Sequence, residues 1–392
     1  MPGPLDGVRV VDLTTVVLGP IATQLLGDAG ADVIKVETVE GDLTRALGPS
    51  RSPDQSAYFA NLNRNKRSLV LDLKQPAARA ALLRVIDTAD VFVHNMRAGA
   101  AARLGLDPAT LLARQPRLIH ASASGFRLGS SKAEDPAYDD IIQGMSGLAT
   151  LNGEANGTDG PRYVPSVMAD KISGHTLTTA IVMALFARER TGRGQALHVP
   201  MLDTMIAFLL PEHLWGATID DPHEGMRYPR LMTPHRRPYA TADGYLCLIA
   251  ATDAQWTRLF ALLGQPELIH DPRFVDVAAR GDNIDAAYGV VAVGLKTKTT
   301  AEWLTLLATA DLPHGAANTM EDLLVDPYLR EVGAFRRFPH ETEGEITVIA
   351  PSVDFTDTAL AITRGAPGLG AHTAEILREA GLDEAAIAAL LA

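Results

Sequence analysis

Cysteine and positive charge are both scarce in this chain of 392 residues. Its one cysteine, Cys247, excludes a disulfide framework within the chain and fits a reducing compartment. Because Cys247 lies in the strand-like run Tyr245–Ile249, we expect it to be a buried small hydrophobe rather than a nucleophile. Lysine and arginine number 35 against 47 aspartates and glutamates, a net charge of −12. So acidic a chain lacks the basic face of a general nucleic-acid-binding protein, and we expect no nucleic acid partner.

Long apolar runs, targeting signals and metal-ligand spacings are missing as well. The longest apolar runs, such as Ala180–Phe186 and Met205–Leu210, are far too short to span a bilayer. The opening segment Met1–Gly7 has no basic stretch followed by an apolar one, which predicts no signal peptide. The histidines show no HxH or HxxxH spacing, which indicates no metal site. We therefore expect a cytoplasmic protein with neither a membrane nor a metal partner.

The first part of the chain alternates strand-like and helix-like runs. Apolar residues make up 47% of the sequence, enough for a large domain and a smaller one. Short β-rich runs separated by helices are typical of βαβ units with a parallel sheet. Helical periodicity then dominates over residues 138–210. The predicted strands are Val8–Leu13, Val33–Val36, Ser68–Leu73, Val91–His94 and Leu118–Ala123.

The alternation breaks in the second half. Residues 216–238 show no clear periodicity, and we interpret them as a linker or lid. A smaller α+β block follows, up to about residue 327. The tail has a strand-like run, Glu345–Ile349, and a helix that begins near His372.

Asp170 is the candidate catalytic residue. It lies between a loop rich in glycine, proline and asparagine (Asn152–Pro165) and the apolar stretch Leu177–Ala187. This spacing places a carboxylate at the start of a helix, where the helix dipole stabilises negative charge. The alternative is that Asp170 is only a helix cap, because aspartate is common there for that reason alone.

Seven different short motifs occur one after another along the chain. They are Leu5–Pro20, Gly30–Glu37, Asn63–Ser68, Ala89–Asn95, Thr191–Gln195, Pro238–Gly244 and Leu369–Thr373. Together they resemble the motifs of the family III CoA-transferases, the formyl-CoA and carnitine-CoA transferase type. One such motif is weak evidence, whereas seven in register over almost the whole chain are strong evidence.

The resemblance implies an α/β fold. A large Rossmann-like domain would have a parallel sheet made from N- and C-terminal segments, beside a smaller α+β domain. The implied boundaries are 1–225 for the first part of the large domain, 226–327 for the small domain, and 328–392 for a C-terminal part that returns to the large domain. Two chains of the family thread through each other like linked rings, so we expect an interlocked homodimer.

The resemblance also implies an acyl-CoA:carboxylate CoA-transferase. It would move CoA from an acyl-CoA to a carboxylic acid through an anhydride and a thioester on Asp170. CoA and acyl-CoA are then substrates, and we expect no permanently bound cofactor. The loop after the first strand is where a doubly wound sheet presents ligands, and basic side chains can pair with CoA phosphates. The implied CoA contacts are Thr15, Val16, Val17, Leu71, Lys74, Asn95, Met96, Arg97, Arg103, Tyr138 and Asp139.

The chain departs from the family pattern at three places. Thr38 and Pro136 stand where relatives have basic residues, and Glu224–Arg230 replaces a glycine-rich lid. Arginine is the better planar partner for a carboxylate. We therefore predict that Arg227 or Arg230 contacts the acceptor acid.

Three rival functions are open to this sequence. An α-methylacyl-CoA racemase of the same fold would have its catalytic histidine at Tyr138, where a phenol of pKa ~10 is a poor substitute. A nicotinamide-dependent dehydrogenase would need a GxGxxG loop, which Thr14–Pro20 does not provide. A CoA-binding scaffold without catalysis is the third.

Overall fold

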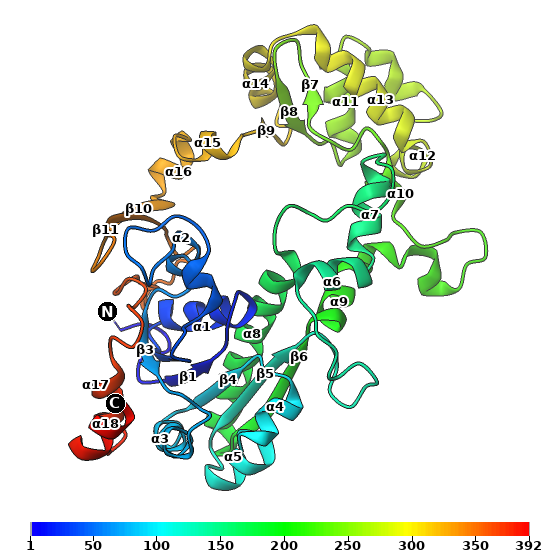
Figure 1. Cartoon of the computed structure of the whole chain (residues 1–392). Coiled ribbons are helices and arrows are strands. Elements are labelled where there is room, and N and C mark those ends of the chain that lie inside the picture. Colours follow the sequence, from blue (N-terminus) through cyan, green and yellow to red (C-terminus); the bar gives the residue numbers. More distant parts are fainter. Residues whose placement is uncertain (1, 392) are drawn as a thin grey trace. The chain divides into compact units, whose positions relative to one another are not determined.

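A computed structural model describes residues 2–391 of the chain (Figure 1). Its contacts divide the chain into two compact units. The large unit holds the residues up to Ser146, Val164–Ala207 and the residues from Pro327 on, and the small unit holds Gly147–Tyr163 and Phe208–Asp326. Within residues 2–391, no helix is long and apolar enough to cross a membrane.

Six parallel strands form the central sheet of the large unit, in the order β3-β2-β1-β4-β5-β6. This is the order of a dinucleotide-binding type sheet, and it reverses direction between β1 and β4. The strands are β1 (Arg9–Leu13), β2 (Asp32–Glu37), β3 (Lys66–Val70), β4 (Val91–His94), β5 (Ile119–Ser124) and β6 (Gln195–Pro200).

The two faces of this sheet differ in chemistry, because successive residues of a strand point to opposite faces. Val11 and Ile34 belong to a hydrophobic core under a layer of helices. Their neighbours Asp12 and Lys35 pair in register and point the other way, where both are fully buried. The helices over the core face are α3 (Pro76–Ile86), α5 (Pro108–Arg114), α17 (Thr373–Glu379) and α18 (Glu384–Leu391).

Helices α1 (Leu18–Asp28) and α8 (Met168–Thr191) pack against each other, and α8 also packs on β5 and β6. Gly174 permits this close approach, since a Cβ there would lie 2.3 Å from Cγ2 of Ile21 and 2.7 Å from the carbonyl oxygen of Leu18. The start of α8 is thereby held beside the start of α1. The other helices of the large unit are α2 (Ala57–Ala60), α4 (Ala98–Arg103), α6 (Asp139–Met145), α16 (Pro327–Glu331) and the first part of α9 (Met201–His213).

The small unit has its own core, which includes Trp256, Phe260 and Trp303. A short antiparallel sheet carries β7 (Tyr239–Ala240), β8 (Tyr245–Leu248) and β9 (His314–Ala316). Its helices are α7 (Leu148–Ala155), α10 (Pro229–Met232), α11 (Asp253–Leu262), α12 (Val277–Asp282), α13 (Ile284–Gly294), α14 (Thr300–Thr309) and α15 (Met320–Leu323).

The α/β class and the parallel sheet are confirmed, but the prediction that C-terminal segments add to this sheet is wrong. The strand expected at 345–349 is β11 (Gly344–Ile349), which pairs with β10 (Phe335–His340) in a separate hairpin. At the edge of β3 the tail makes a turn instead of a strand. The N–H of His372 donates to the carbonyl oxygen of Ser68 (3.0 Å), and Thr373 Oγ1 accepts from the N–H of Val70 (3.1 Å). Helix α17 begins there, so no further strand can pair.

Two smaller expectations are also corrected. Strand β6 lies in a region expected to be helical. Gly192, at φ 71°, ends α8 and lets the chain turn back along β5. Cys247 is exposed rather than buried, because on β8 only the alternate residue, Leu246, faces the core.

The domain boundaries at residues 225 and 327 stay a prediction. In the structure, residues 147–163 and 208–225 pack with the small unit.

Candidate active site

A cavity of about 200 Å³ opens at the carboxyl ends of β1 and β4, where the strand order reverses. Doubly wound sheets bind ligands at this point because the loops that leave the two strands diverge. The loop after β1, the loop after β4 and the first turn of α8 all contribute to the lining. Its residues include Thr15, Val16, Val17, Asn95, Arg97, Asp135, Tyr138 and Asp170.

Asp170 lies in the first turn of α8 but does not cap it. The cap position is Val167, and no side-chain cap bond is formed there. The backbone N–H of Asp170 donates to Oδ1 of Asp139 (3.0 Å), so a carboxylate from another helix satisfies this end of α8. No hydrogen bond or ion pair to the Asp170 carboxylate itself is found within residues 2–391. The arrangement does not support the capping alternative.

The Asp170 carboxylate is held in an unfavourable environment for a charge. Burial, and after it the negative charge of Asp139, raises the pKa of Asp170 from 3.8 to about 7. Buried carboxylates are normally paired with a cation or with several donors. A desolvated, unpaired carboxylate on a cavity is typical of a group selected for reactivity.

Asp139 is oriented by its neighbours on α6 and in the segment before α8. Its Oδ2 accepts from Nε2 of Gln143 (2.6 Å). The same Nε2 donates to the carbonyl oxygen of Ser166 (3.0 Å), and Oε1 of Gln143 accepts from the N–H of Val164 (2.9 Å). Asp139 is therefore a fixed acceptor for α8, buried behind Asp170.

Tyr58, on α2, belongs to the same cluster and was missed from the sequence. Burial raises its pKa, and so do the charges of Asp170 and Asp139. The phenol thus lies within electrostatic range of both carboxylates. A single tyrosine in a four-residue helix gives no sequence signal for this contact.

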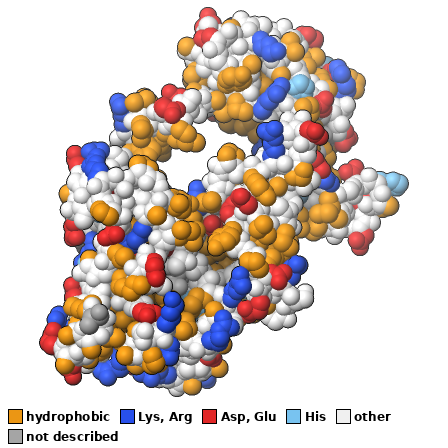
Figure 2. All heavy atoms as spheres, viewed as in Figure 1, with side chains coloured by type: hydrophobic (Ala, Val, Ile, Leu, Met, Phe, Trp, Pro, Cys, Tyr) orange, Lys and Arg blue, Asp and Glu red, His pale blue; other side chains and the backbone are white. Residues whose placement is uncertain are grey.

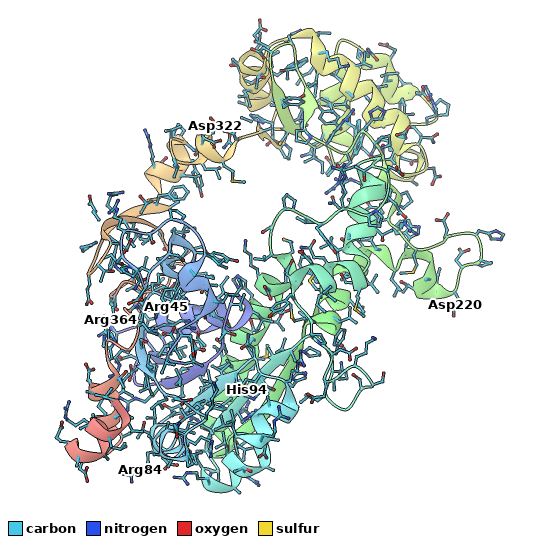
Figure 3. The ribbon with its side chains drawn as sticks, viewed as in Figure 1. Arg45, Arg84, His94, Asp220, Asp322 and Arg364 are labelled. Carbon is cyan, nitrogen blue, oxygen red and sulfur yellow. The ribbon has the colours of Figure 1, made fainter. Side chains whose placement is uncertain are left out.

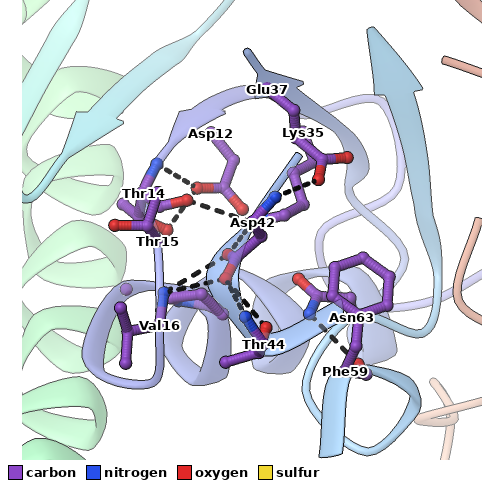
Figure 4. Close-up of polar contacts among 12 residues, drawn as sticks. Asp12, Thr14, Thr15, Val16, Lys35, Glu37, Asp42, Thr44, Phe59 and Asn63 are labelled. Carbon is purple, nitrogen blue, oxygen red and sulfur yellow. Dashed lines mark hydrogen bonds and ion pairs between the residues drawn. The ribbon is translucent and has the colours of Figure 1, made fainter. Parts of the chain in front are cut away.

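Side chains at the ends of β1 and β4 hold the loop after β1, and Figure 4 shows the contact with Asp12 on β1. The N–H and Oγ1 of Thr14 donate to Oδ1 of Asp12 (2.9 and 2.5 Å). The amide of Asn95 accepts from the N–H of Thr15 (3.1 Å) and donates to its carbonyl oxygen (2.9 Å). The loop is consequently fixed from the β1 side and from the β4 side.

Buried lysines neutralise the carboxylates behind this loop. Nζ of Lys35 lies 2.9 Å from Asp42 and Nζ of Lys66 lies 3.1 Å from Asp12, with all four side chains fully buried. Burial alone would raise the pKa of Asp12, but the lysine charges and the threonine hydrogen bonds lower it. Burial opposes the charged form of Asp42 too, yet Lys35 and the Thr44 bonds lower its pKa.

Three histidines lie on adjacent strands of the sheet, His94 at the end of β4, His120 in β5 and His198 in β6 (His94 is labelled in Figure 3). The rings of His94 and His120 are 5.2 Å apart. Burial, with nearby His120 and His198, lowers the pKa of His94 to about 3, and burial lowers the pKa of His120 and His198. These imidazoles are neutral at physiological pH, so they supply no positive charge for an anionic ligand.

The structure brings together six of the eleven predicted CoA contacts. Thr15, Val16, Val17, Asn95, Arg97 and Tyr138 line one cavity with Asp170. Five others lie outside this lining. Leu71 is in the core, Met96 packs against it, and Asp139 is buried behind Asp170, whereas Lys74 and Arg103 are exposed. Their contacts with CoA stay a prediction.

The two arginines predicted to bind the acceptor differ in their surroundings. Nε and Nη2 of Arg227 donate to the Glu154 carboxylate at 2.7 and 2.8 Å, so this guanidinium is already paired. Nε of Arg230 donates to the hydroxyl of Tyr288 (2.8 Å), a neutral partner. Arg230 also lines a cavity of about 660 Å³ in the small unit, with Trp256 and Tyr288.

No cluster of three or more potential metal ligands occurs in residues 2–391. The chemical resources of the cavity are therefore a desolvated carboxylate (Asp170), a phenol (Tyr138), an exposed guanidinium (Arg97) and a rigid backbone loop. A carboxylate of this kind can attack an acyl carbon and carry the acyl group.

Residues 5–373 match the model of CoA-transferase family III. The chain is 35% identical to a succinate–glutarate CoA-transferase of Agrobacterium fabrum, over 96% of this chain and 95% of that protein. It is 39% identical to an acetyl-CoA:oxalate CoA-transferase of Acetobacter aceti, over 80% of each. The crystal structure of a CaiB/BaiF family protein from Brucella suis matches with a TM-score of 0.81 at 32% identity, over 97% of this chain and 100% of that one.

Proposed function

The chain belongs to CoA-transferase family III, and from this premise we propose that Asp170 is the residue that carries the transferred group. The enzyme moves CoA between an acyl-CoA and a carboxylic acid. Exchange of one thioester for another is nearly thermoneutral, so the barrier is kinetic. The proposal concerns which side chain lowers that barrier.

In the proposed sequence, a carboxylate oxygen of Asp170 attacks the donor acyl carbon and the C–S bond breaks. The products are a mixed anhydride on Asp170 and CoA thiolate. The thiolate then attacks the aspartyl carbon, which releases the donor acid and leaves an aspartyl-CoA thioester. The acceptor carboxylate attacks this thioester, and the returning thiolate takes the new acyl group. Each step exchanges one leaving group for one nucleophile, and Asp170 ends as a free carboxylate.

The observation that carries the proposal is the state of the Asp170 carboxylate. It opens on the cavity, and burial raises its pKa to about 7. A carboxylate surrounded by water is a weak nucleophile, and removal of that water makes attack easier. Near pH 7 a large fraction of the group is still ionised, as nucleophilic attack requires.

We place the reacting end of the CoA thioester in this cavity, beside Thr15, Asn95 and Arg97. The 200 Å³ volume is below the roughly 300–1,000 Å³ of typical ligand pockets. It suits the thioester and the adjacent chain rather than a whole CoA molecule. Arg97 is exposed, and no ion partner for it is found within residues 2–391, so it is available for a phosphate or a carboxylate.

For the acceptor acid we propose Arg230 rather than Arg227 as the carboxylate partner. Arg227 would first have to leave Glu154, while Arg230 keeps its Nη groups for a ligand in a cavity lined by aromatic rings. Arg230→Ala should raise the acceptor KM about 10- to 100-fold, the loss of a charge-assisted hydrogen bond. Arg227→Ala, the matched control, should leave it unchanged. Equal effects from the two variants would remove Arg230 from the site.

We further propose an interlocked homodimer that acts in the cytoplasm. The lone cysteine supports a reducing compartment. The middle of helix α8, residues 180–187, is apolar on all sides, with Val182, Met183 and Phe186 exposed beside buried Ile181 and Leu185. Hydrophobic side chains also gather on the visible surface in the region of α6 and α9 (Figure 2). Helical stretches that are apolar on all sides are usually buried, and a second chain would bury this one. Light scattering should give twice the 41.8 kDa chain mass at every dilution, whereas a stable active monomer would contradict the dimer.

A comparison of Asp170→Asn with Asp139→Asn tests the nucleophile. Both changes keep the shape of the side chain and remove its charge. Asp170→Asn should fold and bind CoA but lose transfer by at least about 10³-fold, as removal of a covalent nucleophile usually does. Asp139→Asn keeps an oxygen for the N–H of Asp170, although it loses the acceptor for Nε2 of Gln143, and it should lose far less activity than Asp170→Asn. Transfer by a verified Asp170→Asn protein would end the proposal.

A further inference from the structure

The loop after β1 contains a strained residue at the edge of the cavity. Val16 has a φ of 71°, in the left-handed region that non-glycine residues rarely adopt. Valine is poorly suited to it, because its branched Cβ clashes with the backbone. Val16 lines the same cavity as Asp170. Strain at such a position persists only where surrounding groups impose it.

One side chain reaches the strained residue from behind. Both carboxylate oxygens of Asp42 accept from the N–H of Val16, at 3.2 and 3.4 Å. Asp42 is buried, and Lys35 holds it at 2.9 Å while the N–H and hydroxyl of Thr44 bind its Oδ1 (2.9 and 2.8 Å). Nζ of Lys35 also donates to the carbonyl oxygen of Thr14 (3.0 Å). The Lys35–Asp42 ion pair therefore contacts the loop at Thr14 as well as at Val16.

We propose that Asp42 is a positioning residue for the transfer reaction, which holds Val16 in its left-handed conformation and thereby shapes the wall of the cavity that faces the thioester. This rests on the proposed function of the Asp170 cavity. Asp42 acts through the backbone and does not line the cavity itself. A displaced wall misplaces the reacting carbon, and a shift of about 1 Å can cost around 100-fold in rate.

Substitution of Val16 by glycine or by alanine tests whether Asp42 imposes the left-handed conformation. Both remove the isopropyl group from the cavity, but only glycine adopts a positive φ without strain. If Asp42 is needed to impose that conformation, glycine should make Asp42 partly dispensable and alanine should not.

The readout is the rate at which Asp170 acquires an adduct in a single turnover with acyl-CoA, followed by intact-protein mass. Asp42→Asn should slow this step about 10- to 100-fold. Asp28→Asn is the matched control, a buried carboxylate paired with Arg64 (2.6 Å) that does not touch the loop, and it should slow the step less than threefold. The double variant Asp42→Asn/Val16→Gly should react at least fivefold faster than Asp42→Asn/Val16→Ala. The midpoint of the pH–rate profile should stay where it is in the parent, because Asp42 does not supply charge to Asp170.

Equal rates for the two double variants, or an Asp42→Asn rate no lower than that of Asp28→Asn, would overturn the proposal. A parent enzyme that turns over but forms no Asp170 adduct would instead refute the proposed function. If Asp42→Asn fails to fold, the single variants decide. Val16→Gly should then unfold at a higher temperature than Val16→Ala, the reverse of the usual order of these residues. An equal or lower midpoint for glycine would show that no left-handed conformation is being imposed.

Discussion

Two groups of carboxylates lie around the same cavity and differ in their partners. Behind the β1 loop, Asp12 and Asp42 each contact a buried lysine. At the start of α8, the Asp139 carboxylate accepts from the backbone N–H of Asp170, and no cation is found beside either carboxylate within residues 2–391. The pKa values of the first pair are lowered, and that of Asp170 is raised to about 7.

The difference separates a carboxylate that maintains geometry from one that reacts. A lysine partner makes ionisation favourable, but it also draws electron density from the oxygen that would attack. An unpaired carboxylate costs folding free energy and keeps its lone pairs available. The buried lysines therefore pair with the carboxylates that hold the loop, and Asp170 has no such partner.

Removal of a cation from the paired group should have the largest effect on stability. Lys35→Met would leave Asp42 buried without its lysine, and it should lower the free energy of unfolding by about 3–5 kcal/mol. Urea denaturation at pH 7 measures this loss. A cost below about 1 kcal/mol would mean that the two groups do not differ as described.

Removal of the unpaired charge should instead raise the free energy of unfolding. Between pH 3.8 and about 7 the folded state binds more protons at Asp170 than the unfolded state does, so stability falls as the pH rises through this window. Asp170→Asn should therefore be more stable than the parent by about 1–3 kcal/mol above pH 7. The advantage should shrink towards pH 4 in parallel urea titrations. A variant less stable than the parent at pH 8 would contradict the pKa assignment.

The neighbour of Asp170 should influence the pH dependence of the rate. The adduct-forming step needs ionised Asp170, so its rate should rise with pH and level off above about 7. In Asp139→Asn the like charge is gone, and the midpoint should move to lower pH. It should remain above 3.8, because burial is the larger cause of the shift and is unchanged. A midpoint that does not move would show that Asp139 contributes geometry alone.

An exposed ion pair gives the smallest expected effect and calibrates the others. Arg227 and Glu154 are close to half exposed, and such pairs contribute about 0–1 kcal/mol. Arg227→Ala should change the free energy of unfolding by no more than this, and less so in high salt. A loss as large as that of Lys35→Met would show that the burial of an ion pair does not determine how much its removal costs.

Much of the fold of the large unit could be predicted from the sequence because its strands follow local apolar patterns. Apolar runs placed five of the six strands, and the loop after the first strand was expected to meet a ligand. Strand β6 was not predicted because Gln195–Pro200 is an edge strand in which only Val199 is buried. Its partner, β5, is distant in the sequence.

The partners of the site residues could not be predicted, because they depend on distant contacts. Asp139 and Asp170 are 31 residues apart, and neither reveals from its own segment that a hydrogen bond joins them. The positive φ of Val16 has no sequence signal either, since valine is the residue least expected there. Only the folded arrangement of β1 with Asp42 explains it.

The most direct test is to trap the intermediate. The parent protein is incubated with an acyl-CoA donor without acceptor, quenched with hydroxylamine, digested and analysed by mass spectrometry. We expect a hydroxamate on Asp170, no such product from Asp170→Asn, and the same product in reduced amount from Asp42→Asn. A hydroxamate at another carboxylate, or transfer by Asp170→Asn with reversion to aspartate excluded by mass, would contradict this expectation.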